Sequence, residues 1–162
     1  MKNNRQAGFS LIELLIVVAI IGIIAAIAIP NLLASRRAAN EGSAQSSLRT
    51  IHSAEGTYQA TVGAGNYGSR AELGAENLID NQLEAGGKSG YNFEINPTDL
   101  VVATSPAVFY ATAVPQVTGP IMGTGTRRFG VATDGTMHGD SGGGLAAYAS
   151  EAAVMAAPDL GN

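Results

Sequence analysis

Residues 8–30 read GFSLIELLIVVAIIGIIAAIAIP, and this stretch decides how the rest of the chain is organised. From Phe9 to Ile29 it is almost wholly aliphatic and carries one charge, on Glu13. As a helix, a run of this length crosses the hydrocarbon core of a bilayer, which is about 30 Å thick. A carboxylate inside such a run costs roughly 2.5–3.5 kcal/mol on insertion scales, so we expect Glu13 to have a partner and a role.

Three interpretations of this stretch compete. A plain membrane anchor explains its length but not its one carboxylate. A secretory signal peptide explains the basic residues Lys2 and Arg5 and the A-x-A-like sequence at residues 26–28. Against the signal peptide, the apolar run is longer than usual, contains a charge and is followed by Pro30.

The third interpretation rests on the order of the residues. A short basic leader ends at Gly8, Phe9 follows, and residues 10–13 read Ser-Leu-Ile-Glu, with Gly22 and Pro30 further along. This order closely resembles the class III signal of type IV pilins and of the related pseudopilins of type II secretion. We favour this interpretation.

The resemblance implies how the chain is processed. A prepilin peptidase would cut between Gly8 and Phe9 and methylate the new amino terminus on Phe9. Glu13 would then lie one helical turn from that amine. Independently of the family, the helix macrodipole favours an anion at this end. A free amine of a neighbouring identical subunit would neutralise the carboxylate and set the register of packed helices.

The resemblance also implies partners and location. The precursor would be a single-pass protein of the inner membrane with a cytoplasmic N-terminus, handled by an inner-membrane assembly platform. The assembled form would be an extracellular filament, or a periplasmic one in a pseudopilus. In filaments of the family the helix between Gly22 and Pro30 is commonly melted, so we expect this segment to lose helical bonds on leaving the bilayer.

Composition narrows the function further. The formal net charge is −4, and removal of the leader with Lys2 and Arg5 leaves seven basic against thirteen acidic residues. Dedicated nucleic-acid binding needs clustered cations, so we expect no such site. The chain has no cysteine, which excludes disulfides, thiolate nucleophiles and Cys-ligated metals. Many type IV pilins close a C-terminal loop with a disulfide, and this chain departs from that pattern.

The helix is expected to continue past Pro30, which removes one backbone donor and favours a kink. Residues 31–62 form its amphipathic half, and a helix from Phe9 to about Val62 would be roughly 80 Å long. The polar faces are expected at Arg36, Arg37, Asn40, Glu41, Gln45 and Arg49. The apolar stripe is expected at Ala44, Leu48, Ile51, Tyr58 and Val62.

Residues 63–90 are rich in Gly, Asn and Ala and predict a loop with a short helical insert over residues 75–83. In pilins this position is the αβ-loop. Residues 91–138 then carry strand patterns. Four strands are expected, over residues 91–96 (ended by Pro97), 107–114, 127–133 and 136–138, with a further short strand-like piece over residues 100–103 and a hairpin turn at residues 134–135.

Together these patterns predict an α+β protein. Its long N-terminal helix packs on a small antiparallel sheet of about four strands, which is the ladle-shaped fold of pilins. Residues 139–162 are predicted to be a flexible tail with a short helix between Leu145 and Ala157, which presents Leu145, Tyr148, Ala152 and Met155 on one face.

Catalysis finds little support, and no cofactor is expected. His52 is interpreted as a flank or surface residue of the long helix. Asp134 and Asp140, with His138 between them, are weak candidates for a cation site, because their spacing matches no standard calcium loop. Major pseudopilins of type II secretion do bind calcium with a C-terminal loop.

The sequence therefore predicts a structural subunit, a major-type pilin that polymerises after processing, and not an enzyme. The alternative within the family is the major pseudopilin of a type II secretion system. An alternative from another class is a monomeric bitopic membrane protein with a ligand-binding domain, which would need neither processing at Gly8 nor the carboxylate of Glu13.

Overall fold

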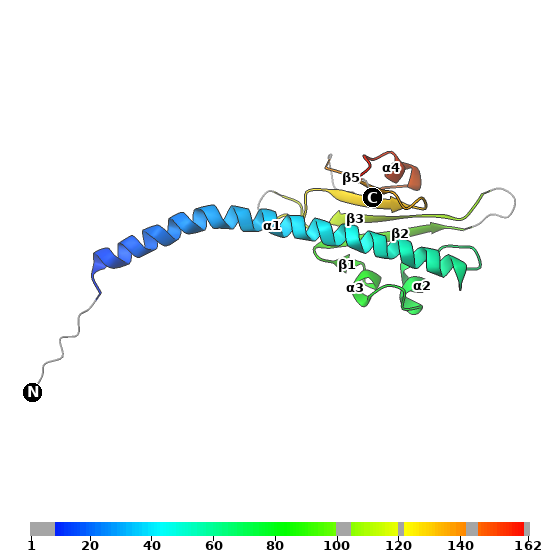
Figure 1. Cartoon of the computed structure of the whole chain (residues 1–162), viewed down its shortest axis with the longest axis horizontal. Coiled ribbons are helices and arrows are strands. Elements are labelled where there is room, and N and C mark those ends of the chain that lie inside the picture. Colours follow the sequence, from blue (N-terminus) through cyan, green and yellow to red (C-terminus); the bar gives the residue numbers. More distant parts are fainter. Residues whose placement is uncertain (1–8, 100–104, 120–121, 142–145, 161–162) are drawn as a thin grey trace, which may run out of the picture. The chain divides into compact units, whose positions relative to one another are not determined.

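The structure is a computed structural model that describes residues 9–99, 105–119, 122–141 and 146–160. Contacts within the chain divide it into two compact units, residues 1–35 and residues 36–162. Each unit is described by itself. Figure 1 labels the helices and strands in chain order.

Helix α1, Leu11–Ala60, contains 50 residues and contributes to both units. The predicted long helix is confirmed, and it ends two residues before the predicted end at Val62. The N–H of Gly63 donates to the carbonyl of Tyr58, and Ala64 then takes a positive φ of 49°, which turns the chain out of the helix. The helix continues through Pro30, and a kink there stays a prediction.

The second unit contains a five-stranded sheet in the order β1-β2-β3-β4-β5, and every neighbouring pair is antiparallel. The α+β class is thereby confirmed. The first strand lies inside the segment predicted as a loop, which explains why about four strands were expected. The strands are β1 (Gly87–Lys88), β2 (Tyr91–Thr98), β3 (Val108–Pro115), β4 (Arg128–Ala132) and β5 (Met137–Asp140).

The prediction that Pro97 ends a strand was wrong, because β2 continues to Thr98 and pairs Pro97 with Phe109. Strand β1 pairs only with Tyr91 and Asn92. Among the described residues, the remaining outer edge of β2 carries no strand, so the missing N–H of a proline there disrupts no ladder on that side. The strand predicted over residues 100–103 lies outside the described residues.

One face of the sheet packs against the second half of α1. Ala44, Leu48 and Ile51 are fully buried, as the apolar stripe predicted, and Tyr58 is half-buried. Val62 is exposed because the helix ends before it, so its place in the stripe was wrong. The sheet contributes the largest buried side chains of this layer, Tyr91, Phe93, Phe109, Phe129, Val131 and Met137.

The opposite face of the sheet is covered by residues 146–160, which include helix α4, Glu151–Met155. Tyr148 and Val154 are buried there against Ala132. The predicted helix is therefore present but has five residues, and Met155 points to solvent instead of packing. A single helix from Leu145 to Ala157 does not form because Ser150 caps a new helix start with its hydroxyl.

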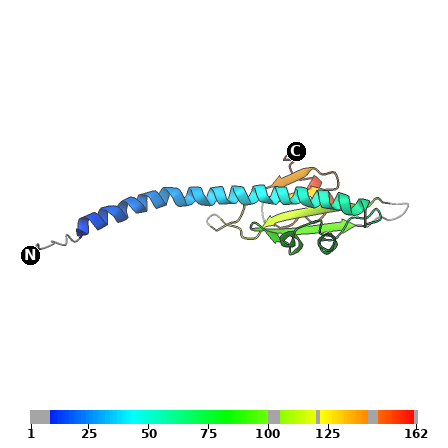
Figure 2. The ribbon, with the colours of Figure 1, turned by 60° about the horizontal axis from the view of Figure 1, so that its bottom comes forward.

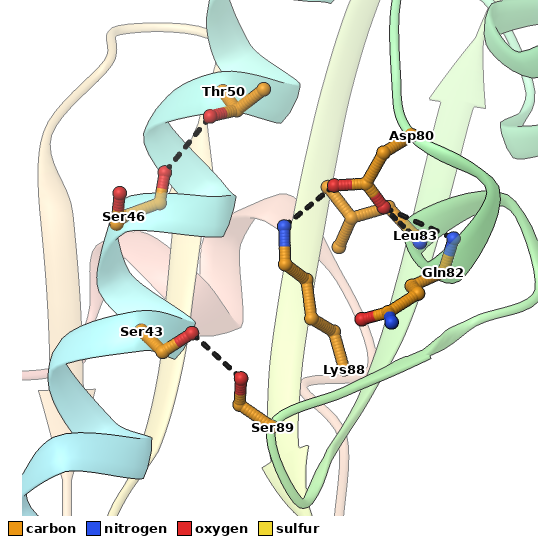
Figure 3. A network of polar contacts seen from close by, with 8 residues as sticks. All are labelled: Ser43, Ser46, Thr50, Asp80, Gln82, Leu83, Lys88 and Ser89. Carbon is orange, nitrogen blue, oxygen red and sulfur yellow. Dashed lines mark hydrogen bonds and ion pairs between the residues drawn. The ribbon is translucent and has the colours of Figure 1, made fainter.

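Two short helices, α2 (Arg70–Ala75) and α3 (Asn81–Glu84), replace the single insert predicted over residues 75–83. Ser69 and Glu72 form a capping box at the start of α2, and Asp80 caps α3. Asp80 also forms a 2.6 Å ion pair with Lys88, and Ser89 accepts a 2.9 Å hydrogen bond from Ser43 of α1 (Figure 3). These contacts fix the predicted αβ-loop.

Glu55 is a fully buried carboxylate on α1. Its Oε2 accepts a 2.8 Å hydrogen bond from the N–H of Gly68, whereas its Oε1 has no partner among the described residues. Burial raises the pKa of Glu55 to about 7; the Gly68 N–H opposes this increase, and the nearby Glu72 adds to it. The folded state therefore binds this proton more tightly than the unfolded state does.

We predict that this site makes the second unit less stable as pH rises from about 4.5 to about 7, because the unfolded carboxyl already ionises near 4.5. Glu55→Gln removes this pH dependence. The difference in free energy of unfolding, variant minus natural chain, should therefore increase by up to about 3 kcal/mol from about pH 4 to about pH 8. Urea unfolding in mild detergent measures this difference. The exposed Glu94→Gln is the control; equal pH profiles for Glu55→Gln and the natural chain would contradict the account.

The close approach of the C-terminal segment to β4 gives a second prediction. A Cβ at Gly130 would lie 2.9 Å from Cγ1 of Val154 and 3.1 Å from the ring of Tyr148. Gly130→Ala should cost about 1–3 kcal/mol by overpacking and should expose the segment to proteases. The control is Gly42→Ala on α1, where a Cβ meets no atom within 4 Å. The free energy of unfolding of that control variant should rise by up to about 1 kcal/mol. Equal proteolysis of both variants would refute the packing argument.

Candidate functional site

The N-terminal segment is the candidate site, and its structure begins at Phe9, since Gly8 lies outside the described residues. The side chain of Phe9 is 92% exposed. Helix α1 begins at Leu11, and the carbonyl of Ser10 accepts its first bond, from the N–H of Leu14 at 3.3 Å. Phe9 therefore stands just outside the helix.

Glu13 folds back over the start of the helix. Its Oε2 accepts a 2.9 Å hydrogen bond from the N–H of Ser10, which the helix itself leaves without a partner. The side chain thus lies at the positive end of the helix dipole, as the sequence predicted. Sequence reasoning missed this bond within the chain, although Ser-x-x-Glu at residues 10–13 is the sequence signal of a capping box.

The rest of the segment presents an apolar surface. The large apolar side chains between Phe9 and Ile29 are 51–92% exposed. Among the described residues, α1 is the one helix that is long and apolar enough to cross a membrane. An exposed apolar surface of this extent marks a binding surface for lipid or for other helices.

Gly22 and Pro30 both lie within α1, so the structure gives the helical form of the segment that they bracket. A Cβ at Gly22 would meet no atom within 4 Å in this single chain. Near Pro30, the side-chain amide of Asn31 donates to the carbonyl of Ile27 at 3.1 Å, which strengthens the turn that lacks the proline N–H. Within the apolar segment between Phe9 and Pro30, the glycine and the proline are the two residues with the lowest helix propensity.

In the second unit, polar bonds tie the β3–β4 connection to α1. Glu41 was predicted on a polar face but is buried, and its Oε1 accepts hydrogen bonds from the N–H and the hydroxyl of Thr126, both at 2.8 Å. Its Oε2 accepts from Nε of Arg127 at 3.0 Å. Burial alone would raise the pKa of Glu41, but these hydrogen bonds together lower it. No periodicity in the sequence reveals this site.

The candidate cation ligands are held separately. The carboxylate of Asp134 accepts a 3.0 Å bond from the N–H of Thr136, and Oδ2 of Asp140 accepts from Arg128 at 2.9 and 3.2 Å. The bond to Asp140 raises the pKa of Arg128. His138 is buried, with its Nδ1 2.8 Å from the carbonyl of Ala157. Within the described residues no three acidic or histidine side chains form a metal-binding group.

His52 lies half-buried at the flank of α1. Its ring centroid is 5.8 Å from that of Phe109, and a Cβ at Gly135 would lie 3.0 Å from the imidazole. The packing of its ring at the edge of the core agrees with the predicted flank position.

Comparison with known proteins finds similarity in the N-terminal segment. Residues 3–29 match the family model of the prokaryotic N-terminal methylation motif. The chain is 46% identical over 56 residues to the type IV major pilin protein PilA of Myxococcus xanthus, which is 35% of this chain and 26% of that protein. It is 63% identical over 41 residues to the type IV wide pilus major component PilA4 of Thermus thermophilus, 25% of this chain and 30% of that one.

A third relative is the type II secretion system core protein G of Aeromonas hydrophila, 34% identical over 59 residues, 36% of this chain and 41% of that protein. No solved structure matches the chain significantly. The matched part thus spans less than half the length of these relatives. The matches confirm the predicted resemblance: the N-terminal part of the chain is similar to those of type IV major pilins and of type II secretion core protein G.

The weak positions of α1 generate a prediction for hydrogen exchange. In a helix interior, the missing backbone donor and the ring clash of a proline together cost about 3 kcal/mol. Pro30→Ala restores the donor and removes the clash. The amides of residues 26–34 should therefore exchange more slowly in this variant than in the natural chain, in the same detergent. The amides around Leu48, which are held by the core, are the internal control. Unchanged exchange in residues 26–34 would show that Pro30 does not weaken the helix.

Proposed function

We propose that this chain is a structural subunit, a major-type pilin that polymerises into a helical filament after cleavage between Gly8 and Phe9 and N-methylation of Phe9. The observation that carries the proposal is a long exposed apolar helix surface with a single carboxylate at its N-terminal end. The family of the N-terminal segment supports the same function.

The physical argument begins with the apolar surface. The exposure of so many apolar side chains between Phe9 and Ile29 to water is unfavourable, and two environments can bury them. Before assembly the bilayer does so, with the N-terminus on the cytoplasmic side of the inner membrane. After assembly the same surface packs against the N-terminal helices of identical subunits.

Glu13 gives the assembled state its register. In the single chain, one of its carboxylate oxygens accepts a hydrogen bond from the N–H of Ser10 at the N-terminal end of the helix. A carboxylate in an apolar bundle needs a cation, and the amino terminus on Phe9 of a neighbouring subunit supplies one. Only one axial offset between neighbours brings these two groups together, so the pair selects that offset.

Gly22 and Pro30 have a role in the same transition. Both are poor helix residues, and the segment between them can exchange helical bonds for an extended path when the subunit leaves the bilayer. The further partners of the pathway are a prepilin peptidase and an inner-membrane assembly platform. The product is an extracellular filament without catalytic activity.

A second candidate function is the major pseudopilin of a type II secretion system, which would place the filament in the periplasm. The similarity to type II secretion core protein G favours it. A monomeric bitopic protein with a ligand-binding domain explains the anchor but gives no role to the carboxylate of Glu13.

The test is Glu13→Leu, measured as membrane-inserted precursor and as filament sheared from the cells. Insertion should be unchanged because leucine is more apolar, whereas filament yield should fall more than about tenfold, since the amine of each neighbour is left buried without a counter-ion. The control is Glu76→Gln, which changes an exposed carboxylate of the second unit. Unchanged filament yield in Glu13→Leu would overturn the proposed role of this residue.

A further inference from the structure

The connection between β3 and β4 follows α1 toward the end at which the helix enters the second unit. Thr126 bonds to Glu41, the carbonyl of Thr124 accepts from Nδ2 of Asn40 at 2.8 Å, and the carbonyl of Gly123 accepts from Nε of Arg37 at 3.2 Å. As the residue number falls along the connection, so does the number of its partner on α1. Figures 1 and 2 both show the connection at this end of the unit.

The next described residue of the connection is Met122, and its side chain is 81% exposed. Val117, on the other arm of the connection, is 45% exposed. The N–H of Thr124 donates to the carbonyl of Val117 at 2.9 Å, so the two arms are held together. The hydrogen bonds to α1 therefore hold the connection in place, with Met122 and Val117 exposed on it as an apolar pair.

Charge is distributed unevenly over the second unit. The end formed by the described residues 36–41, 116–119 and 122–127 carries three arginines, Arg36, Arg37 and Arg127. It carries one acidic residue, Glu41, which is buried and forms an ion pair with Arg127. The remainder of the unit carries four basic against eleven acidic residues. The exposed apolar pair thus lies at the one basic end of an otherwise acidic body.

We propose that this end of the second unit is a lipid-binding surface that docks on the anionic bilayer holding the unassembled precursor. Met122 and Val117 enter the boundary between headgroups and acyl chains, and the exposed Arg36 binds the lipid phosphates. Apolar side chains flanked by cations are what such a boundary binds. The inference rests on the proposed function in one respect, that the apolar helix is inserted before assembly.

The length of chain available supports this partner. Five residues join Pro30 to Arg36. They span about 9 Å as a helix. Fully extended, they span about 20 Å. The headgroup layer adds roughly 5–7 Å on each side of the hydrocarbon core. Arg36 therefore stays within reach of the phosphates, while the acidic remainder of the unit is repelled by them.

The absence of cysteine from the chain makes the test direct, because a nitroxide can be attached to single cysteines in the full-length protein. Labels at Met122→Cys and at Met155→Cys compare two exposed methionines, of which the second lies on α4. A third label at Ile20→Cys reports whether α1 is inserted. Collision with oxygen, relative to collision with a water-soluble nickel complex, measures the depth of each label.

In vesicles that contain about 30% phosphatidylglycerol, the label at residue 122 should report the lipid boundary and the label at residue 155 should report water. Arg36→Gln should lower the docked fraction at residue 122, with its docking equilibrium falling roughly fivefold. Arg49→Gln, an exposed arginine further along the same helix, is the matched control and should leave it unchanged. Vesicles of phosphatidylcholine alone should weaken docking in the same direction as Arg36→Gln.

Three results would overturn the proposal. If the label at residue 20 is inserted while that at residue 122 reports water, the helix is anchored but the loop does not dock. If residue 122 is shielded only at high ratios of protein to lipid, its partner is a second copy of the chain. If residue 20 itself reports water, the membrane-anchored precursor of the proposed function fails, and the lipid contact fails with it.

Discussion

The constraint on which this molecule depends is the exposure of a continuous apolar helix that water cannot solvate favourably. Between Phe9 and Ile29 more than half of every large apolar side chain is open, and the only charge is that of Glu13 at the helix start. A helix of this kind needs lipid or other helices around it. The hydrophobic core of the single chain therefore excludes this segment and begins only at the second half of α1.

The second half of α1 holds the small sheet without a disulfide, since the chain has no cysteine. Apolar packing of Leu48 and Ile51 is one of the interactions that hold it. Buried hydrogen bonds are the other, since Glu41 accepts three hydrogen bonds from the β3–β4 connection. The C-terminal segment closes the second face, where Arg128 binds Asp140 and lies 4.2 Å from the ring centroid of Tyr148.

The parts of this structure that periodicity encodes could be predicted from the sequence, and the parts that depend on tertiary contacts could not. The long helix, its stripe at Leu48 and Ile51 and the antiparallel strands carry local signals. The continuation of β2 through Pro97 depends on an edge without a partner strand, and the burial of Glu41 depends on donors about 85 residues away. At the N-terminus, motif and spacing predicted a role for Glu13 at the start of the helix but did not reveal its bond to Ser10.

The central claim is that processing at Phe9 creates the subunit that assembles. Its most direct test is the intact mass and N-terminal sequence of the protein sheared from the surface of its native cells. The account predicts a filament-enriched fraction that begins at N-methylated Phe9. Processed chain found only in the envelope would favour the pseudopilus. A chain that still begins at Met1, or one that begins at Ile29 after signal-peptide cleavage, would contradict the account.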